Sequence, residues 1–203
     1  MYRSLVVCGA ALFLATPALA KPPAPTAAQV TIDSVSYSGP GCPAGSAAAN
    51  LSPDAQAFTI GFSKLAVAQG EGATGPIKSS CTLHLKVSIP SGWSYALATV
   101  DYVGYVSLDP GLTASRQSTY HISGEAPEQT VAYDWPSGYQ GDYFVDDIGA
   151  GEPAYWSRCG KGKNLMIDTQ IAIDATGNPK GSALVTVDSV DGEVYHLIWR
   201  QCK

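Results

Sequence analysis

The chain has 203 residues, 45% of them hydrophobic, and a formal net charge of −5 from 17 Asp and Glu against 12 Lys and Arg. This length suffices for one domain with a substantial core. The mildly acidic balance provides no clustered positive charge for nucleic acid or for an anionic membrane surface. We therefore expect a single domain that binds no nucleic acid and inserts into no membrane.

The first twenty residues have the pattern of a secretory signal peptide. After a short basic start, residues 5–15 (LVVCGAALFLA) are apolar, and residues 18–20 (ALA) form a small-x-small cleavage site. The apolar run is shorter than the roughly 20 residues that span a bilayer. We expect residues 1–20 to be a removed signal peptide, 21–28 a Pro/Ala-rich leader and 29–203 a secreted domain, extracellular or periplasmic.

Four cysteines follow the signal peptide, and in a secreted chain this even number indicates two disulfides. They are Cys42, Cys81, Cys159 and Cys202. Four cysteines permit three pairings, and the sequence alone does not choose between them. We favour Cys42–Cys81 and Cys159–Cys202, because each pair ties together one half of the chain. No two of the four stand at the close spacing of a zinc site.

Between the cysteines, short segments alternate apolar and polar residues, as half-buried strands do. The clearest is residues 81–89 (CTLHLKVSI), and the pattern recurs at residues 56–62, 165–173 and 195–199. Turn residues rich in Gly and Pro separate these segments, and no window carries a sustained helical stripe. The sequence therefore predicts an all-β fold, a single antiparallel β-sandwich or jelly-roll-like domain with two disulfides.

The sequence contains no convincing cofactor or catalytic motif. Residues 70–75 (GEGATG) match a dinucleotide glycine pattern, but Pro76 and a strand follow where a helix is needed. The three histidines form no metal-binding motif, and no serine lies in a nucleophile elbow. We therefore expect no cofactor and favour a protein that is not an enzyme. A catalytic triad assembled from distant residues stays open.

Residues 141–152 (GDYFVDDIGAGE) are crowded with carboxylates. These are Asp142, Asp146, Asp147 and Glu152. Oxygen ligands at this density make a calcium candidate, and paired carboxylates can hydrolyse glycosidic bonds. However, the spacing matches no EF-hand loop, and in an extended chain Asp146 and Asp147 would point to opposite faces. We interpret the stretch as a solvated acidic loop and keep calcium as the alternative.

Aromatic side chains give the better functional signal. Tyr and Trp combine an apolar ring face with a polar group, which suits contact surfaces and sugar stacking. The candidate binding residues are Trp135, Tyr139, Tyr143 and Trp156, the first three in a segment broken by Gly and Pro. Packing in the core is the alternative for these residues, and we assign Trp199 to the core.

Taken in order, several blocks of the chain resemble a family of secreted proteins catalogued as domain of unknown function 4360. The matching stretches are SVSYSGPGCPAGS at 34–46, LSPDAQAFTIGFS at 51–63, VDYVGYVSLDPGL at 100–112, STYHISG at 118–124, YWSRCG at 155–160 and DSVDGEVYHLIWRQC at 188–202. The resemblance covers nearly the whole chain after the signal peptide. It implies an exported β-protein held by disulfides, with Cys42 in the first bridge, and it implies no catalytic residue.

The sequence thus favours an exported, non-catalytic β-sandwich that binds at a cell surface or in the extracellular matrix, with polysaccharide as a candidate partner. The first alternative is a protein-directed inhibitor or effector, for which residues 64–80 would be the inserted loop. The second alternative is a hydrolase with a dispersed carboxylate site. Such a site needs two carboxyl groups about 5–9.5 Å apart.

Overall fold

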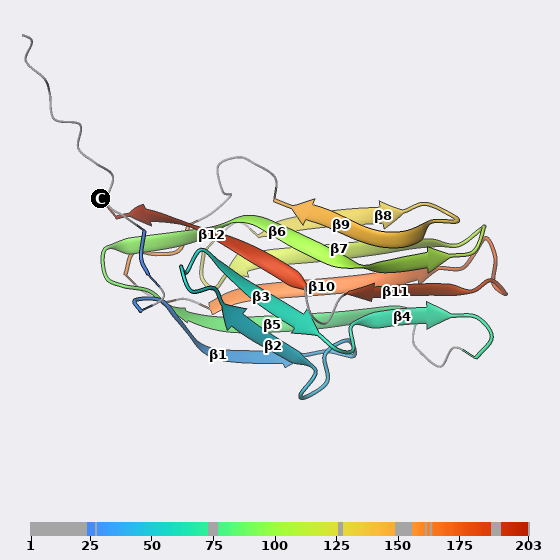
Figure 1. Cartoon of the computed structure of the whole chain (residues 1–203), viewed down its shortest axis with the longest axis horizontal. Coiled ribbons are helices and arrows are strands. Elements are labelled where there is room, and N and C mark those ends of the chain that lie inside the picture. Colours follow the sequence, from blue (N-terminus) through green and yellow to red (C-terminus); the bar gives the residue numbers. More distant parts are fainter. Residues whose placement is uncertain are drawn as a thin grey trace, which may run out of the picture.

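A computed structural model describes residues 24–26, 28–72, 77–125, 128–148, 156–160, 162, 164–187 and 192–202. Within these ranges the regular structure consists of β-strands, most of which run along the long axis of the molecule (Figure 1). The predicted signal peptide lies outside the described residues. In the part of the chain that is described, no helix is long and apolar enough to cross a membrane.

The strands form two antiparallel sheets that pack face to face as a sandwich. The five-stranded sheet contains, in spatial order, β1 (Thr31–Ser38), β5 (Lys78–Ser88), β10 (Asn164–Asp174), β7 (Thr113–Ile122) and β8 (Gln129–Trp135). The seven-stranded sheet contains β2 (Ala47–Leu51), β3 (Ala57–Phe62), β12 (Glu193–Gln201), β6 (Trp93–Leu108), β11 (Ala183–Val187) and β4 (Ala66–Gln69), with β9 (Gln140–Asp147) also paired to β6. The predicted all-β sandwich is confirmed.

The long strand β6 organises the seven-stranded sheet. Its first part pairs with β12, and its second part pairs with β11 on one side and β9 on the other. Tyr105, for example, faces Thr186 of β11 and Asp142 of β9. Strand β9 is therefore held along a free edge of β6, and its outward side chains share one open sheet face with those of β6 and β11.

Inward side chains from both sheets form one hydrophobic cluster between them. The period-two prediction is confirmed in each segment that carried it: Phe58 of β3, Leu85 of β5, Ile167 of β10 and Trp199 of β12 are all buried. Each such side chain contributes roughly 1.5–3 kcal/mol by leaving water. The sandwich is thus stabilised mainly by the burial of apolar side chains between its two sheets.

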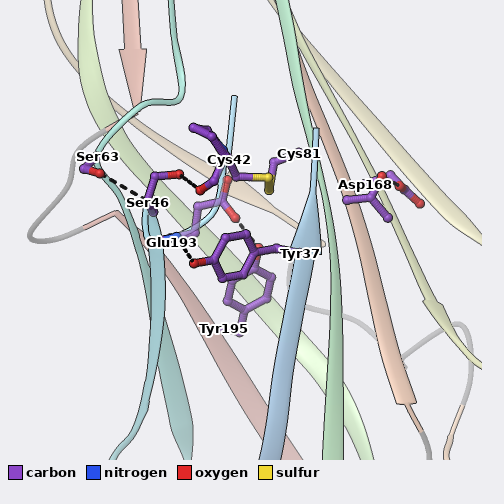
Figure 2. The surroundings of a disulfide bond; sticks show 11 residues. Tyr37, Cys42, Ser46, Ser63, Cys81, Asp168, Glu193 and Tyr195 are labelled. Carbon is purple, nitrogen blue, oxygen red and sulfur yellow. Dashed lines mark hydrogen bonds between the residues drawn. A yellow bond between two sulfur atoms is a disulfide. The ribbon is translucent and has the colours of Figure 1, made fainter. Parts of the chain in front are cut away.

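Both favoured disulfides are present. Cys42 bonds Cys81 and Cys159 bonds Cys202, with Cα separations of 5.4 and 5.8 Å. The first bridge is buried beside Tyr37 and joins the loop after β1 to β5 (Figure 2). That loop runs so close to β5 that a Cβ on Gly39 would lie 2.3 Å from a backbone oxygen of β5. The glycines around Cys42 therefore let the chain reach its bridge.

Candidate functional site

The predicted aromatic residues at 135–143 pack mainly into the core. Trp135 ends β8 and Tyr143 lies in β9, and their rings are only 1% and 5% exposed. The two ring centroids lie 4.8 Å apart. Tyr139, in the turn between the strands, is half-buried and donates a hydrogen bond from its hydroxyl to the Asp142 carbonyl at 3.1 Å. In this structure neither Trp135 nor Tyr143 offers a ring face to a ligand.

Trp156 lies at the opposite end of β6 from these three residues. The backbone N–H of Ser157 donates to the carbonyl of Tyr95, near the start of β6, whereas Tyr139 meets β6 at its last residue. The half-buried Trp156 ring stacks under Arg200, whose guanidinium carbon is 4.2 Å from the ring centroid. The structure therefore separates Trp156 from the other predicted aromatic residues.

Two exposed aromatic rings lie together on the outer face of the seven-stranded sheet. Phe144 of β9 is 64% exposed and Tyr105 of β6 is 40% exposed. Phe144 faces Val103 across the β6–β9 ladder, and Tyr105 is the next outward residue along β6. Leu184 of β11 is 38% exposed and faces Ser107 of β6. We call Val103, Tyr105, Phe144 and Leu184 the outer aromatic face.

Carboxylates border this face. Asp142 and Asp146 flank Phe144 on the outer side of β9, and Asp101 of β6 lies directly opposite Asp146. Partial desolvation raises the pKa of Asp146, and a hydrogen bond and charge repulsion from Asp101 raise it further. The Nε2 atom of His196 lies 2.8 Å from a carboxylate oxygen of Asp101. Strands β6, β9 and β11 contain no Lys or Arg, so this border is negative.

A glycine in β6 allows β9 and β11 to hold this face in place. Tyr143 faces Gly104 across the ladder, and its hydroxyl reaches over the strand to donate to the Thr186 carbonyl at 2.9 Å. A Cβ on Gly104 would lie 2.1 Å from that carbonyl oxygen and 2.7 Å from the Tyr143 ring. The Tyr143 ring therefore occupies the space that a side chain at position 104 would need. Its anchoring fixes the neighbouring Phe144 outward.

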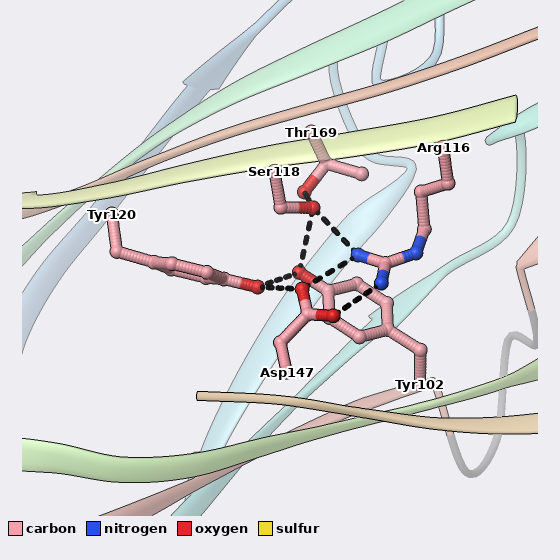
Figure 3. A network of polar contacts seen from close by, with 6 residues as sticks. All are labelled: Tyr102, Arg116, Ser118, Tyr120, Asp147 and Thr169. Carbon is pink, nitrogen blue, oxygen red and sulfur yellow. Dashed lines mark hydrogen bonds and ion pairs between the residues drawn. The ribbon is translucent and has the colours of Figure 1, made fainter. Parts of the chain in front are cut away.

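A buried ion pair fixes the other end of β9. Arg116 of β7 donates two hydrogen bonds to Asp147, at 2.5 and 2.9 Å, and both side chains are fully buried (Figure 3). Tyr120 also donates to Asp147 at 2.7 Å. The Arg116 guanidinium lies 3.6 Å above the centroid of the Tyr102 ring. Burial lowers the pKa of Arg116, but its hydrogen bonds to Asp147 and nearby charge outweigh that effect and raise it. The pair joins the two sheets.

A second carboxyl group lies in the same core. Glu193 begins β12 and is fully buried; it accepts a hydrogen bond from Tyr195 through Oε2, while Oε1 has no hydrogen-bond partner among the described residues. Burial raises the pKa of Glu193 to about 8, against the opposing effects of Tyr195 and Arg116. The side chain is therefore mostly protonated at neutral pH. No ligand in solvent can reach it, so we assign it a structural role.

The acidic stretch forms a strand up to Asp147, so its interpretation as a loop was wrong there. Strand β9 sends Asp142 and Asp146 outward and Asp147 into the core, as the extended geometry predicts. Glu152, the fourth predicted carboxylate, lies outside the described residues. The structure therefore does not bring the predicted calcium ligands together. Among the residues it describes, no group of three His, Cys, Asp or Glu side chains could hold a metal ion.

Comparison with known proteins assigns the chain to a family. The family model for a domain of unknown function, DUF4360, matches residues 28–202. The protein belongs to the DUF4360 family. An uncharacterized secreted protein of Arthroderma benhamiae is 32% identical over 184 residues, which cover 88% of this chain and 74% of that protein. The resemblance found in the sequence is confirmed.

Solved structures add only a distant likeness. TmCBM61, solved in complex with β-1,4-galactotriose, is 11% identical to the DUF4360 protein and superposes with a TM-score of 0.32. The match covers 83% of this chain and 90% of that one. A likeness at this level carries no information about a ligand or a site. Its relative is a secreted protein, and its two disulfides are of the kind that persists in secreted proteins. The DUF4360 protein is secreted.

Sequence reasoning missed the exposed rings of the DUF4360 protein, Tyr105 and Phe144. A signal for them exists in the stretch VDYVGYVSL at residues 100–108, which has apolar residues at both inward and outward positions. Outward positions of a sheet that is wet on one side are commonly polar. A group of apolar residues at such positions is therefore the signal that the sequence offered for these exposed rings.

Proposed function

We propose that the DUF4360 protein is a non-catalytic module that binds polysaccharide at a cell surface or in the extracellular matrix, through its outer aromatic face. One observation carries the proposal: Phe144 and Tyr105 are exposed together on neighbouring strands of one open sheet face. Large apolar side chains that are exposed as a group commonly mark a contact with a partner. Flanking polar groups would hydrogen-bond the hydroxyls of a sugar.

The sheet gives the two rings a regular arrangement. Phe144 faces Val103, so Tyr105 occupies the diagonal position, about 7–8 Å away. Rings held at this spacing on an open sheet face can each stack on the apolar face of a sugar unit of one chain. Such a platform suits an extended polymer better than a small ligand, which is usually enclosed in a cleft.

Charge narrows the class of polysaccharide. Asp101, Asp142 and Asp146 border the face, and its three strands supply no Lys or Arg. Complementarity of charge therefore favours neutral or amine-bearing chains over anionic ones such as pectate. Anionic chains would meet like charge at the rim.

The geometry of the carboxylates supports binding rather than hydrolysis. Asp101 and Asp146 face each other on adjacent strands and share a hydrogen bond. Glycosidase carboxyl groups stand farther apart, about 5–9.5 Å, because the scissile bond lies between them. Residues 64–80 were predicted as the inserted loop of the inhibitor alternative, and this was wrong where they form β4 and the start of β5. Residues 73–76 lie outside the described residues, and none of the features above involves this segment.

A depletion assay tests the proposal. The secreted protein is mixed with insoluble cellulose, chitin, chitosan and a pectate gel, and the supernatant is assayed for protein and for released sugar. We expect protein to leave the supernatant with a neutral or amine-bearing polymer, no loss with pectate, and no released sugar. Phe144→Ala and Tyr105→Ala should each weaken binding by about 5–30-fold, equal to about 1–2 kcal/mol.

Tyr133→Ala is the matched control, because Tyr133 is 41% exposed on β8 of the other sheet. It should bind as the parent protein does. Trp156→Ala and Tyr139→Ala test the two half-buried rings that the sequence proposed. Full binding by Phe144→Ala would rule out the outer aromatic face. Released sugar would identify an enzyme. If the protein binds none of the polymers, polysaccharide binding is refuted and a protein partner is favoured.

A further inference from the structure

The outer face of the five-stranded sheet, remote from the aromatic face, carries one apolar residue at an unusual place. The outward residues in the first part of β10 are Asn164, Met166, Asp168 and Gln170, of which only Met166 is not polar. Two of the three histidines of the chain flank it. His84 of β5 faces Met166 on one side, and His121 of β7 faces it on the other. All three side chains are partly exposed on the outer face.

We infer that His84, Met166 and His121 form a binding site for a soft monovalent metal ion, Cu(I) being the expected one. Thioether and imidazole are the ligand types that together select Cu(I). Because no group of three His, Cys, Asp or Glu side chains in the described part of the chain could hold a metal, this site depends on the methionine sulfur. The hard cations Ca²⁺ and Mg²⁺, which prefer oxygen ligands, are not expected there.

The sheet spacing allows the three side chains to converge. Facing residues of antiparallel strands have Cα atoms about 4.5 or 5.5 Å apart, so the Cα atoms of His84 and His121 stand roughly 10 Å apart with Met166 between them. The two rings can lean toward each other above Met166. The methionine side chain, unbranched and with three rotatable bonds, can raise its sulfur to meet them.

The neighbours of the two rings leave nitrogen atoms available. The His84 ring makes no hydrogen bond or ion pair with any residue that the structure describes. The Nδ1 atom of His121 lies 3.4 Å from a carboxylate oxygen of Glu128. A carboxylate at Nδ1 favours the tautomer whose Nε2 lone pair is free, the arrangement that commonly orients metal-binding histidines. Glu128 is thus a positioning residue for His121.

Silver(I), a redox-inert stand-in for Cu(I), gives a direct test in chloride-free buffer. The chain has only one methionine besides Met1, so ¹³C-methyl-methionine NMR reports on Met166 without overlap in the secreted protein. We expect the Met166 methyl resonance to shift and saturate at one silver ion per chain. Competition with a Cu(I) chelator should then give a matching one-to-one stoichiometry for copper.

Variants distinguish silver binding at this site from nonspecific binding elsewhere on the protein. Met166→Leu, His84→Gln and His121→Gln should each weaken silver binding by more than Glu128→Gln, for which about tenfold is expected of an outer partner. His196→Gln is the matched control, because His196 lies on the other sheet and contacts Asp101; it should bind silver normally. Thermal melts verify that each variant is folded.

Three results would overturn the inference. Silver could bind without moving the Met166 resonance, or bind His84→Gln as tightly as the parent protein. Alternatively, Zn²⁺ could bind more tightly than silver and equally well to Met166→Leu. None of these results bears on polysaccharide binding, which involves the opposite sheet.

Discussion

Replacing Glu193 with glutamine should change how the stability of the protein depends on pH. Burial raises the pKa of Glu193 to about 8 in the folded protein, whereas the ordinary value is 4.5. Between these values the folded state holds a proton that the unfolded state has lost, so a rise in pH favours unfolding. The free energy of unfolding should fall by about 1.4 kcal/mol per pH unit, or roughly 4–5 kcal/mol across the interval.

The sign follows from the raised pKa. The stabilising contribution is fully present below about pH 4.5, declines as pH rises and is lost above about pH 8. Glutamine has nearly the same shape and no charge at any pH, so its contribution should be constant. Its NH₂ group would take the place of an oxygen atom that has no partner among the described residues, at a cost of about 1–3 kcal/mol.

The two stability profiles should therefore cross. At pH 5 Glu193→Gln should be less stable than the parent by about 1–3 kcal/mol, and at pH 9, where the parent has lost roughly 4 kcal/mol, more stable by roughly 1–3 kcal/mol. Urea unfolding at pH 5, 7 and 9 measures both. Glu128→Gln, a change at an exposed carboxylate, should keep the parent profile. Parallel profiles for Glu193→Gln and the parent would refute the reasoning, because they would mean that folding does not change the pKa of Glu193.

Two further substitutions test how β9 is held. Asp147→Ala leaves the buried Arg116 guanidinium without its bidentate partner and should lower the free energy of unfolding in urea by about 3–5 kcal/mol; a loss below about 1 kcal/mol would contradict the assigned ion pair. Gly104→Ala places a Cβ against the Thr186 carbonyl and the Tyr143 ring, and should cost about 1–3 kcal/mol. An unchanged melting temperature for Gly104→Ala would show that the strands are not closed around position 104.

The strands that the sequence predicts best are those with a polar outer face. In β5 and β10 every inward residue of the predicted segment is small, apolar or Thr169, so the period of two is plain. The order of strands is not predictable in this way. Strand β5 lies between β1 and β10, which are far apart in the sequence, and such pairing depends on contacts that no local pattern records. The favoured disulfide pairing is the one present, although four cysteines permit three pairings and the sequence alone does not choose between them.

Strand β9 escaped prediction because carboxylates crowd residues 141–152, one of them at an inward position. Its inward positions are Tyr143, Val145 and Asp147, and a carboxylate at a core position makes the stretch resemble a solvated loop. What permits the carboxylate is Arg116, which lies 31 residues earlier and on the opposite sheet. A buried charge is tolerated only with a well-placed partner. The sequence contains both residues, but the fold brings them into contact and no local pattern predicts it.

The register of β9 determines both its buried and its exposed side chains. In a strand, a shift of one residue turns every inward side chain outward. Such a shift would move Asp147 away from Arg116 and bury Phe144 in place of Tyr143. The ion pair and the Tyr143–Gly104 contact therefore select the same register from two ends of the strand. The exposure of Phe144 is thus a consequence of how the core is held together. This explains why a composition rich in Tyr and Trp did not indicate which rings would be exposed.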